Sequence, residues 1–273
     1  MLLLLKKGTM SEMAETTNDW RVIKLGGSLL SPYAMGLTLL QEGKLPFDVV
    51  FAKELLQKLA ESKKKCVLVV GGGFLNRWYL QKIRELNLEK PETQTDFHYL
   101  GMAASEMNAT LFRILAGEVF GFEHVFPKVV KYQDYDNLEE LKPEFEHFQL
   151  VIGAGWKPGH SHDVDALLFA SLFGQQQAYS FKDIDGIYSA DPKKNPTAVK
   201  KKTLTWADYR AIINTNHHLP GASFPIDGVA AQLAEKSGIG FTVIDGRDMR
   251  AVEEVLAEGM TTRGSTILLS VSQ

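Results

Sequence analysis

The sequence predicts an α/β fold with a mainly parallel central sheet, and three observations support this prediction. Short apolar runs of strand length alternate with segments of helical period along the chain. Three of these runs end in glycine-rich turns, at residues 26–28, 71–73 and 153–159. The 273 residues are 45% hydrophobic and 23% charged, which is ordinary for a globular protein with a large core.

The first half of the chain is expected to supply three strands that end in glycines. They cover residues 21–25, 66–70 and 148–155. Cys66 opens the second strand and is expected to be a buried thiol; as the single cysteine of the chain it cannot form an intrachain disulfide. The spacing of apolar residues predicts helices over 47–65, 74–86, 100–121 and 163–174.

The second half is expected to begin with a strand at 177–181, followed by turn residues at 185–196. Thr205 is expected to be the N-cap of a helix that ends near residue 214. The remaining predicted elements are a helix at 226–238 and strands at 240–245 and 265–270. We therefore expect one domain over 20–273, with lobes at about 20–176 and 177–273, after a loose leader at 1–19.

Charge and hydropathy exclude several classes of partner. The net charge is −3, with 30 Lys and Arg against 33 Asp and Glu, so no broad basic field is available for a nucleic acid. No apolar run reaches the length of a membrane span, and the apolar run at the N-terminus is only four residues long. We expect a cytoplasmic protein that binds small molecules and neither nucleic acid nor membrane.

The glycine turns are suited to phosphate. Ligands bind beyond the carboxyl ends of parallel strands, and glycine there lets backbone N–H groups approach a phosphate closely. A helix N-terminus after each turn adds partial positive charge. A single glycine turn is structural about as often as it binds a phosphate. Three such turns at successive strand ends could hold the phosphate groups of two ligands end to end. No P-loop or dinucleotide-binding glycine motif is present, which disfavours both of those folds.

Charged residues stand where phosphoryl transfer needs them. Lys24 and Lys182 each end a strand, Arg77 lies one helical turn after Gly73, and Asp163 begins a helix. Phosphoryl transfer depends mainly on cations around the moving group. A single charged residue is more often a solvated surface ion, but Lys24 closes a buried strand and therefore needs an anionic partner.

Two histidines and two aspartates lie within six positions of the stretch 155–172: His160, His162, Asp163 and Asp165. A metal site needs three or four convergent ligands, and adjacent residues rarely point to one centre. The spacing also misses the usual zinc patterns. We therefore favour a phosphate-handling loop over a metal site.

The chain resembles the amino acid kinase family, most closely its uridine monophosphate kinase branch, over about residues 20–270. The matching segments are "KLGGSLL", "VVGGGFLNR", "LGMAASEMNATLF", "KPGHSHDVDALL", "DIDGIYSADPKKNP" and a closing "GSTI". The resemblance implies a three-layer αβα sandwich and transfer of the γ-phosphoryl group of ATP to UMP, with ATP and Mg²⁺ as cofactors. It also implies a homo-oligomer of dimers that assemble into hexamers. The long predicted helix would lie near the contact between subunits, unless its apolar face is buried wholly inside one subunit. This face carries Met107, Leu111, Phe112 and Leu115.

The resemblance also implies roles for the matching residues. The catalytic group would be Lys24, Asp163 and Lys182, with Asp163 orienting the lysines. ATP binding would involve Gly26, Gly27, Ser28, Gly73, Asp185, Tyr188 and Asp191. Acceptor binding would involve Gly72, Arg77, Asp96, His98, Gly155, Gly159, His160, Ser161 and His162. No protein metal site is expected, because Mg²⁺ would be held mainly by phosphate oxygens and water.

Two departures from the family pattern leave alternatives open. His98 stands where the branch carries an aspartate that binds the acceptor ribose, and Asp96 lies two residues earlier. Lys182 replaces a small polar residue, and in this respect the segment resembles the molybdenum storage protein. The alternatives are therefore nucleotide-dependent storage of molybdate or tungstate, or a kinase of another small phosphate acceptor. His217 and His218 are expected to lie in an exposed loop.

Overall fold

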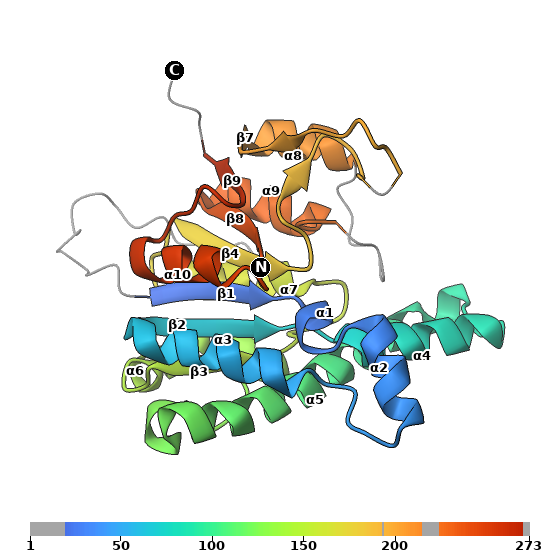
Figure 1. Cartoon of the computed structure of the whole chain (residues 1–273), viewed down its shortest axis with the longest axis horizontal. Coiled ribbons are helices and arrows are strands. Elements are labelled where there is room, and N and C mark those ends of the chain that lie inside the picture. The colour runs from blue at the N-terminus through green and yellow to red at the C-terminus, as the bar shows by residue number, and fades with distance from the viewer. Residues whose placement is uncertain (1–19, 193, 215–223, 270–273) are drawn as a thin grey trace.

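A seven-stranded sheet forms the centre of the protein in the computed structural model (Figure 1). The structure describes residues 20–192, 194–214 and 224–269, so the predicted leader and the His217-His218 loop lie outside the described residues. The strand order is β3-β2-β1-β4-β8-β9-β7. Neighbouring strands are parallel except β8 and β9, which are antiparallel. The strands are β1 (Trp20–Leu25), β2 (Lys65–Val70), β3 (Leu150–Gly153), β4 (Gln177–Lys182), β7 (Thr203–Thr205), β8 (Gly240–Asp245) and β9 (Ser265–Leu268).

Helices cover both faces of this sheet. Successive residues of β1 point to opposite faces, so Val22 belongs to one apolar cluster and Ile23 to the other. The cluster around Ile23 includes residues of α3 (Val49–Ser62), α5 (Gln94–Phe120) and α10 (Met249–Glu258). The cluster around Val22 includes residues of α6 (Leu138–Phe145), α7 (His162–Leu172), α8 (Trp206–Ile213) and α9 (Gly228–Ser237). The predicted three-layer αβα sandwich is therefore confirmed.

Three further helices lie beyond the ends of the central strands. In Figure 1, α1 (Gly27–Leu30), α2 (Tyr33–Gln41) and α4 (Gly73–Glu85) stand past the arrowheads of β1 and β2. A small antiparallel pair, β5 (Ile187–Tyr188) and β6 (Lys200–Lys201), follows β4. The parallel direction of β1, β2, β3 and β4 brings their carboxyl ends to one edge of the sheet, where the glycine turns meet.

Most predicted elements are present, with shifted ends. The helix predicted from residue 100 begins at Gln94. The apolar pattern missed residues 94–99 because Phe97 is the single buried residue among them, which is too few to show a helical period. The strand predicted over 148–155 ends at Gly153. The next N–H group, that of Ala154, donates to the carbonyl of Val130, which lies outside the named strands. Thr205 caps α8 as predicted and accepts from the Asp208 N–H. Helices α1, α2, α6 and α10 were not predicted; α10 begins after Asp248, whose carboxylate accepts two backbone N–H groups.

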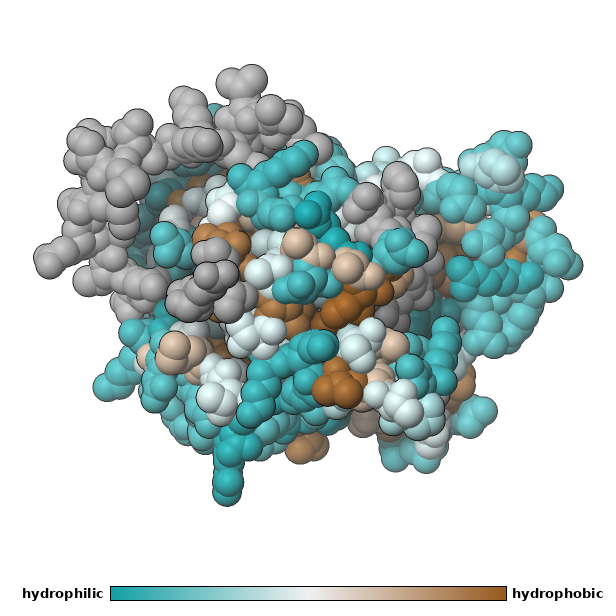
Figure 2. Space-filling view, turned by 90° about the horizontal axis from the view of Figure 1, so that it is seen from above, coloured by the Kyte–Doolittle hydropathy of each residue, from teal (hydrophilic) through white to brown (hydrophobic). Residues whose placement is uncertain are grey.

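Polar and apolar residues share the surface, and the helix α5 shows both burial and exposure of its apolar residues. In Figure 2, hydrophilic side chains cover much of the visible face and apolar residues gather toward its middle. On α5, Phe112 is fully buried, Leu111 and Leu115 pack half-buried against the core, and Met107 is 61% exposed. None of the helices in the described ranges is long and apolar enough to cross a membrane.

Candidate active site

A cavity of about 310 Å³ opens at the edge of the sheet where the carboxyl ends of β1, β2 and β4 meet. Its walls are the glycine turns after β1 and β2, the start of α7 and the end of β4. Thirteen of the predicted site residues line it: Lys24, Gly26, Gly27, Ser28, Gly72, Gly73, Arg77, His98, His160, Ser161, His162, Asp163 and Lys182. The structure thus brings together residues that are up to 158 positions apart in the sequence.

The two glycine turns touch one another, and this contact requires glycine. A Cβ atom on Gly27 would lie 2.2 Å from the Gly73 nitrogen and 2.5 Å from the Gly71 oxygen. Gly73 also has a φ of +59°, in the left-handed region that L side chains rarely adopt. Asn108 on α5 holds the second turn by donating to the Gly71 carbonyl at 3.0 Å. These close approaches leave backbone N–H groups and the starts of α1 and α4 at the cavity.

Lys24, Asp163 and Lys182 form the charged centre of the cavity. The Lys24 Nζ lies 3.6 Å from Asp163 Oδ1, and these side chains are only 12% and 6% exposed. Burial favours the neutral carboxyl, but Lys24 and Lys182 hold the pKa of Asp163 below its ordinary value. Burial, helped by the charge of Lys24, lowers the pKa of Lys182 to about 7. An anion placed beside Lys182 would favour the charged form of this lysine.

Asp227 completes this centre and was not predicted from the sequence. Its backbone N–H donates to Asp163 Oδ2 at 3.2 Å, and its carboxylate accepts from the Ser161 hydroxyl. The same carboxylate caps α9 by accepting from the N–H groups of Val229 and Ala230. Burial, followed by the charge of Asp163, raises the pKa of Asp227 to about 6. Asp227 therefore links the loop before α7 to the start of α9.

Arg77 and His98 line the cavity on the side of α4 and α5. Arg77 projects from the first turns of α4 and donates to the Ser28 hydroxyl. His98 is half-buried in the first turns of α5, and burial lowers its pKa. His160 lies near enough to His98 for their charges to interact, and its pKa is also lowered, mainly by burial. This side of the cavity offers one guanidinium and two imidazoles. The other lining residues that were not predicted are Gly71, Asn76, Leu80, Phe97, Gly101, Met102, Lys157, Asp183, Ile184 and Phe224.

Three predicted acceptor residues do not line the cavity. Asp96 is exposed in the first turn of α5, away from the lining. Gly155 is buried behind the loop, where its N–H donates to the Ser105 hydroxyl at 3.1 Å. Gly159 is exposed and adopts a φ of +81°, so it shapes the loop instead of facing the cavity.

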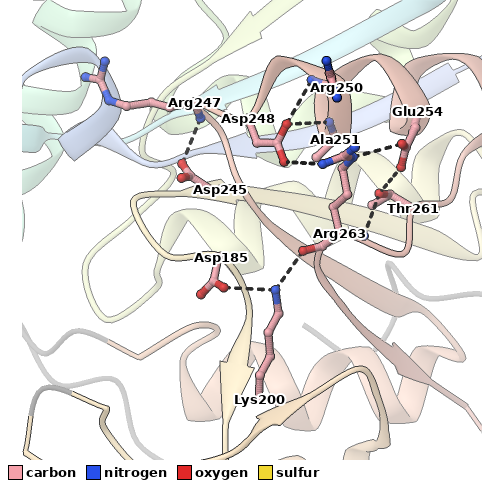
Figure 3. Close-up of polar contacts among 10 residues, drawn as sticks. All are labelled: Asp185, Lys200, Asp245, Arg247, Asp248, Arg250, Ala251, Glu254, Thr261 and Arg263. Carbon is pink, nitrogen blue, oxygen red and sulfur yellow. Dashed lines mark hydrogen bonds and ion pairs between the residues drawn. The ribbon is translucent and has the colours of Figure 1, made fainter. Parts of the chain in front are cut away.

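The three predicted donor-side residues also lie outside this cavity. Tyr188 donates its hydroxyl to Asp185 at 3.1 Å, and Asp191 lies 3.9 Å from the Lys194 Nζ. Lys200 joins Asp185 to the carbonyl oxygen of Arg263, at 3.1 and 2.8 Å. Figure 3 shows this link continuing through Arg263 to Asp248, the N-cap of α10, and to Glu254 within that helix. Asp185 is therefore part of a surface polar network in the structure without ligand.

Contacts within the histidine-rich loop hold His160 at the cavity wall. The His160 ring lies 4.8 Å from the Trp156 ring, and its Nδ1 is 3.3 Å from the Pro158 oxygen. His162 begins α7, and Asp165 is buried in the first turn of that helix. Among the residues that the structure describes, no three His, Cys, Asp or Glu side chains are grouped as metal ligands.

Comparisons with known proteins agree with this arrangement. The model of the amino acid kinase family matches residues 19–245. The uridylate kinase of Methanocorpusculum labreanum is 30% identical over 238 residues, which cover 87% of this chain and 91% of that protein. The uridylate kinase of Archaeoglobus fulgidus is 30% identical over 88% of this chain and 97% of its own length.

Solved structures extend the comparison to three dimensions. The crystal structure of the Archaeoglobus fulgidus uridylate kinase matches with a TM-score of 0.63 and 27% identity, covering 90% of this chain and 99% of that one. The UMP kinase of Bacillus anthracis matches with a TM-score of 0.68, and at 17% identity it supports the fold alone. Because the family model and the relatives each span most of the sequence, the chain belongs to the amino acid kinase family.

Proposed function

We propose that this protein is a nucleoside monophosphate kinase that transfers the γ-phosphoryl group of ATP to UMP, giving ADP and UDP. The observation that carries the proposal is the Lys24–Asp163–Lys182 centre, which lies between two touching glycine turns and the start of α7. The relatives named uridylate kinase support UMP as the acceptor. Storage of molybdate or tungstate is not favoured, because the relatives that match most of the chain are named uridylate kinase.

The charged centre suits the transition state of this reaction. An oxygen of the UMP phosphate attacks the γ-phosphorus of ATP, and the bond from that phosphorus to the β,γ-bridging oxygen breaks. The attacking oxygen is already anionic, so no general base is required. Lys24 and Lys182 lie where they can stabilise the charge on the transferring group. Asp163 stays ionised and positions Lys24, which lies 3.6 Å from it.

We assign the two nucleotides to opposite ends of the cavity. Gly26, Gly27, Ser28 and Gly73 would surround the phosphates of ATP, and Mg²⁺ bound there would supply further positive charge. We assign Asp185, Tyr188 and Asp191, which lie outside the cavity lining, to the nucleoside of ATP. Arg77 and the loop 157–162 surround the phosphate of the acceptor. We further propose that the protein works in the cytoplasm as a homo-oligomer of dimers, with lobes at about 20–176 and 177–273.

His98 is the better candidate for the acceptor ribose than Asp96. His98 lines the cavity, whereas Asp96 is exposed outside the lining. His98→Ala should therefore raise the KM for UMP about tenfold, which corresponds to the loss of one good hydrogen bond. Asp96→Ala should leave this KM unchanged and serves as the matched control. A raised KM in Asp96→Ala alone would mean that α5 shifts when the acceptor binds.

The experiment that tests the proposed function is an acceptor panel. UMP, CMP, AMP and GMP are each incubated with Mg-ATP, and the diphosphate products are quantified by ion-exchange chromatography. We expect UMP to be the best acceptor. Molybdate and tungstate are tested in parallel; ATP-dependent retention of either oxyanion, with no monophosphate phosphorylated, would establish storage instead.

A further inference from the structure

Lys157 is a lysine of the cavity lining to whose side chain the proposed reaction gives no role. It opens the loop before α7 and is half-buried, whereas Trp156 before it is only 4% exposed and lies outside the lining. The Lys157 Nζ lies 3.6 Å from the centre of the Trp156 ring. An ammonium over a tryptophan ring is attracted by the negative charge at the ring face. The ring therefore holds this ammonium in place before any ligand binds.

The Trp156 ring is itself a fixed support. Its Nε1 donates to Asp136 at 3.2 Å, and the ring lies 6.3 Å from the ring of Tyr135. The Tyr135 hydroxyl in turn donates to the carbonyl of Ala154 at 2.6 Å, two residues before Trp156. The buried ring cannot turn away from Lys157 without loss of these contacts.

A turn of the backbone brings Lys157 and His160 to the same support. The His160 N–H donates to the carbonyl of Lys157 at 3.3 Å, and the His160 ring lies 4.8 Å from the Trp156 ring. Both residues line the cavity, as does His98 from α5. Lys157 therefore lies on the side of the cavity that the proposed function assigns to the acceptor.

Lys157 differs from Lys24 in what balances its charge. The Lys24 Nζ has the carboxylate of Asp163 at 3.6 Å. Within the described ranges, no carboxylate lies within ion-pair distance of the Lys157 ammonium, and its neighbour is the neutral ring of Trp156. A ring face orders a cation without neutralising it, so the full charge of Lys157 is available to an anionic ligand.

The phosphate of the acceptor needs more positive charge than Arg77 alone supplies. A phosphate monoester carries a charge of about −1.5 to −2 at pH 7, and it must approach the anionic γ-phosphate of ATP. His98 and His160 add little charge at this pH, because burial lowers the pKa of both. A second cation on this side would offset the repulsion between the two phosphates, and an ordered lysine loses less side-chain freedom when it binds.

We propose that Lys157 is an acceptor-binding residue whose ammonium, held over Trp156, is the second cation on the phosphate of the acceptor. This inference rests on the proposed function, because it assigns the loop 157–162 to the UMP side of the cavity. It predicts that Lys157 selects acceptors that carry a phosphate, with little effect on the binding of the nucleoside or of ATP.

Two ligands that differ only in the phosphate test this role on the full-length protein without ATP. The Kd for UMP is measured by calorimetry and the Kd for uridine by ligand-observed NMR. Lys157→Met keeps a long unbranched side chain and removes its charge. The Kd for UMP should therefore rise about tenfold, as expected for the loss of one hydrogen bond to a charged group. The Kd for uridine and the KM for ATP should stay within about twofold, and Lys157→Arg should restore most of the affinity for UMP.

Lys236→Met is the matched control, because it removes an exposed lysine near the C-terminal end of α9, outside the lining. It should change none of these constants. Equal weakening of UMP and uridine in Lys157→Met would mean that Lys157 only shapes the loop, and a raised KM for ATP would place it on the donor. Either result, or an unchanged Kd for UMP, would overturn the inference while wild-type turnover of UMP stays intact. A wild type that phosphorylates no monophosphate would overturn the proposed function, and this inference with it.

Discussion

Binding of ATP should draw about one proton into the protein at pH 8, and Lys182 is the group that takes it up. This lysine is buried at the end of β4, and its Nζ donates to the carbonyl of Phe224. Burial is the main cause that lowers its pKa to about 7, and the charge of Lys24 is the second. Phosphate oxygens beside the amine favour its charged form and should restore its pKa toward the ordinary range.

The expected uptake follows from this pKa. A lysine with a pKa of about 7 is protonated in about one molecule in ten at pH 8, in about half at pH 7 and in about nine in ten at pH 6. If bound ATP keeps Lys182 charged, the uptake is about 0.9 proton per ATP at pH 8. It falls to about 0.5 at pH 7 and about 0.1 at pH 6 by the same relation.

Isothermal titration calorimetry measures this quantity directly. A non-hydrolysable ATP analogue is titrated at each pH in two buffers of different ionisation enthalpy, and the slope of the binding enthalpy gives the protons taken up. Lys182→Met should remove the uptake, whereas Lys236→Met, an exposed lysine on α9, should leave it unchanged. A slope near zero for the wild type at pH 8, or an unchanged slope in Lys182→Met, would refute the reasoning.

Three further predictions test the charged centre, the acceptor site and the assembly. Lys24→Ala removes the partner of Asp163 and one cation at the transferring group, so kcat should fall about 100-fold or more in a steady-state assay, with the melting temperature showing a folded protein. Arg77→Lys replaces a planar fork with a point charge, so the KM for UMP should rise with kcat little changed. Light scattering at micromolar concentration should show an oligomer; a monomer alone would contradict the assembly.

The pH dependence of stability gives one more prediction, with its sign set by Lys182. The unfolded lysine holds its proton up to about pH 10.5, and the native one releases it at about 7. Between these values the unfolded state binds more protons, so the free energy of unfolding should rise with pH from 7 toward 10. Urea denaturation at several pH values measures this rise, and Lys182→Met should flatten it.

Local patterns predicted the elements that follow simple rules. The strand at 240–245 has the predicted bounds. Thr205 caps α8 as predicted, because threonine before a helical segment is a common N-cap that can be recognised from the sequence. The start of α5 could not be found in the same way, because residues 94–99 contribute a single buried side chain, that of Phe97. The short helix α1 was also invisible: it is four residues long and exists because Gly27 packs against Gly73, a contact between distant segments.

The charged centre of the site was predictable because strand ends place residues at one edge of the sheet. Lys24, Lys182 and Asp163 could be grouped because each follows or ends a predicted strand or begins a helix. Asp227 was missed because it lies 64 residues from Asp163 and looks like an ordinary N-cap. The one feature of the sequence that could have indicated it is an aspartate directly before a predicted helix in the second half of the chain. Asp96 is exposed outside the cavity lining, and its place on α5 could not be judged from a pattern that did not show where this helix begins.

The central claim is that this protein moves a phosphoryl group from ATP to UMP at the Lys24–Asp163–Lys182 centre. The most direct measurement is a single-turnover reaction of enzyme in excess with UMP and ATP labelled in its γ-phosphorus. We predict that the label appears in the β-phosphoryl group of UDP, in step with ADP release, and that Lys24→Ala loses this transfer. Release of the label as free phosphate, with no labelled UDP, would contradict the account.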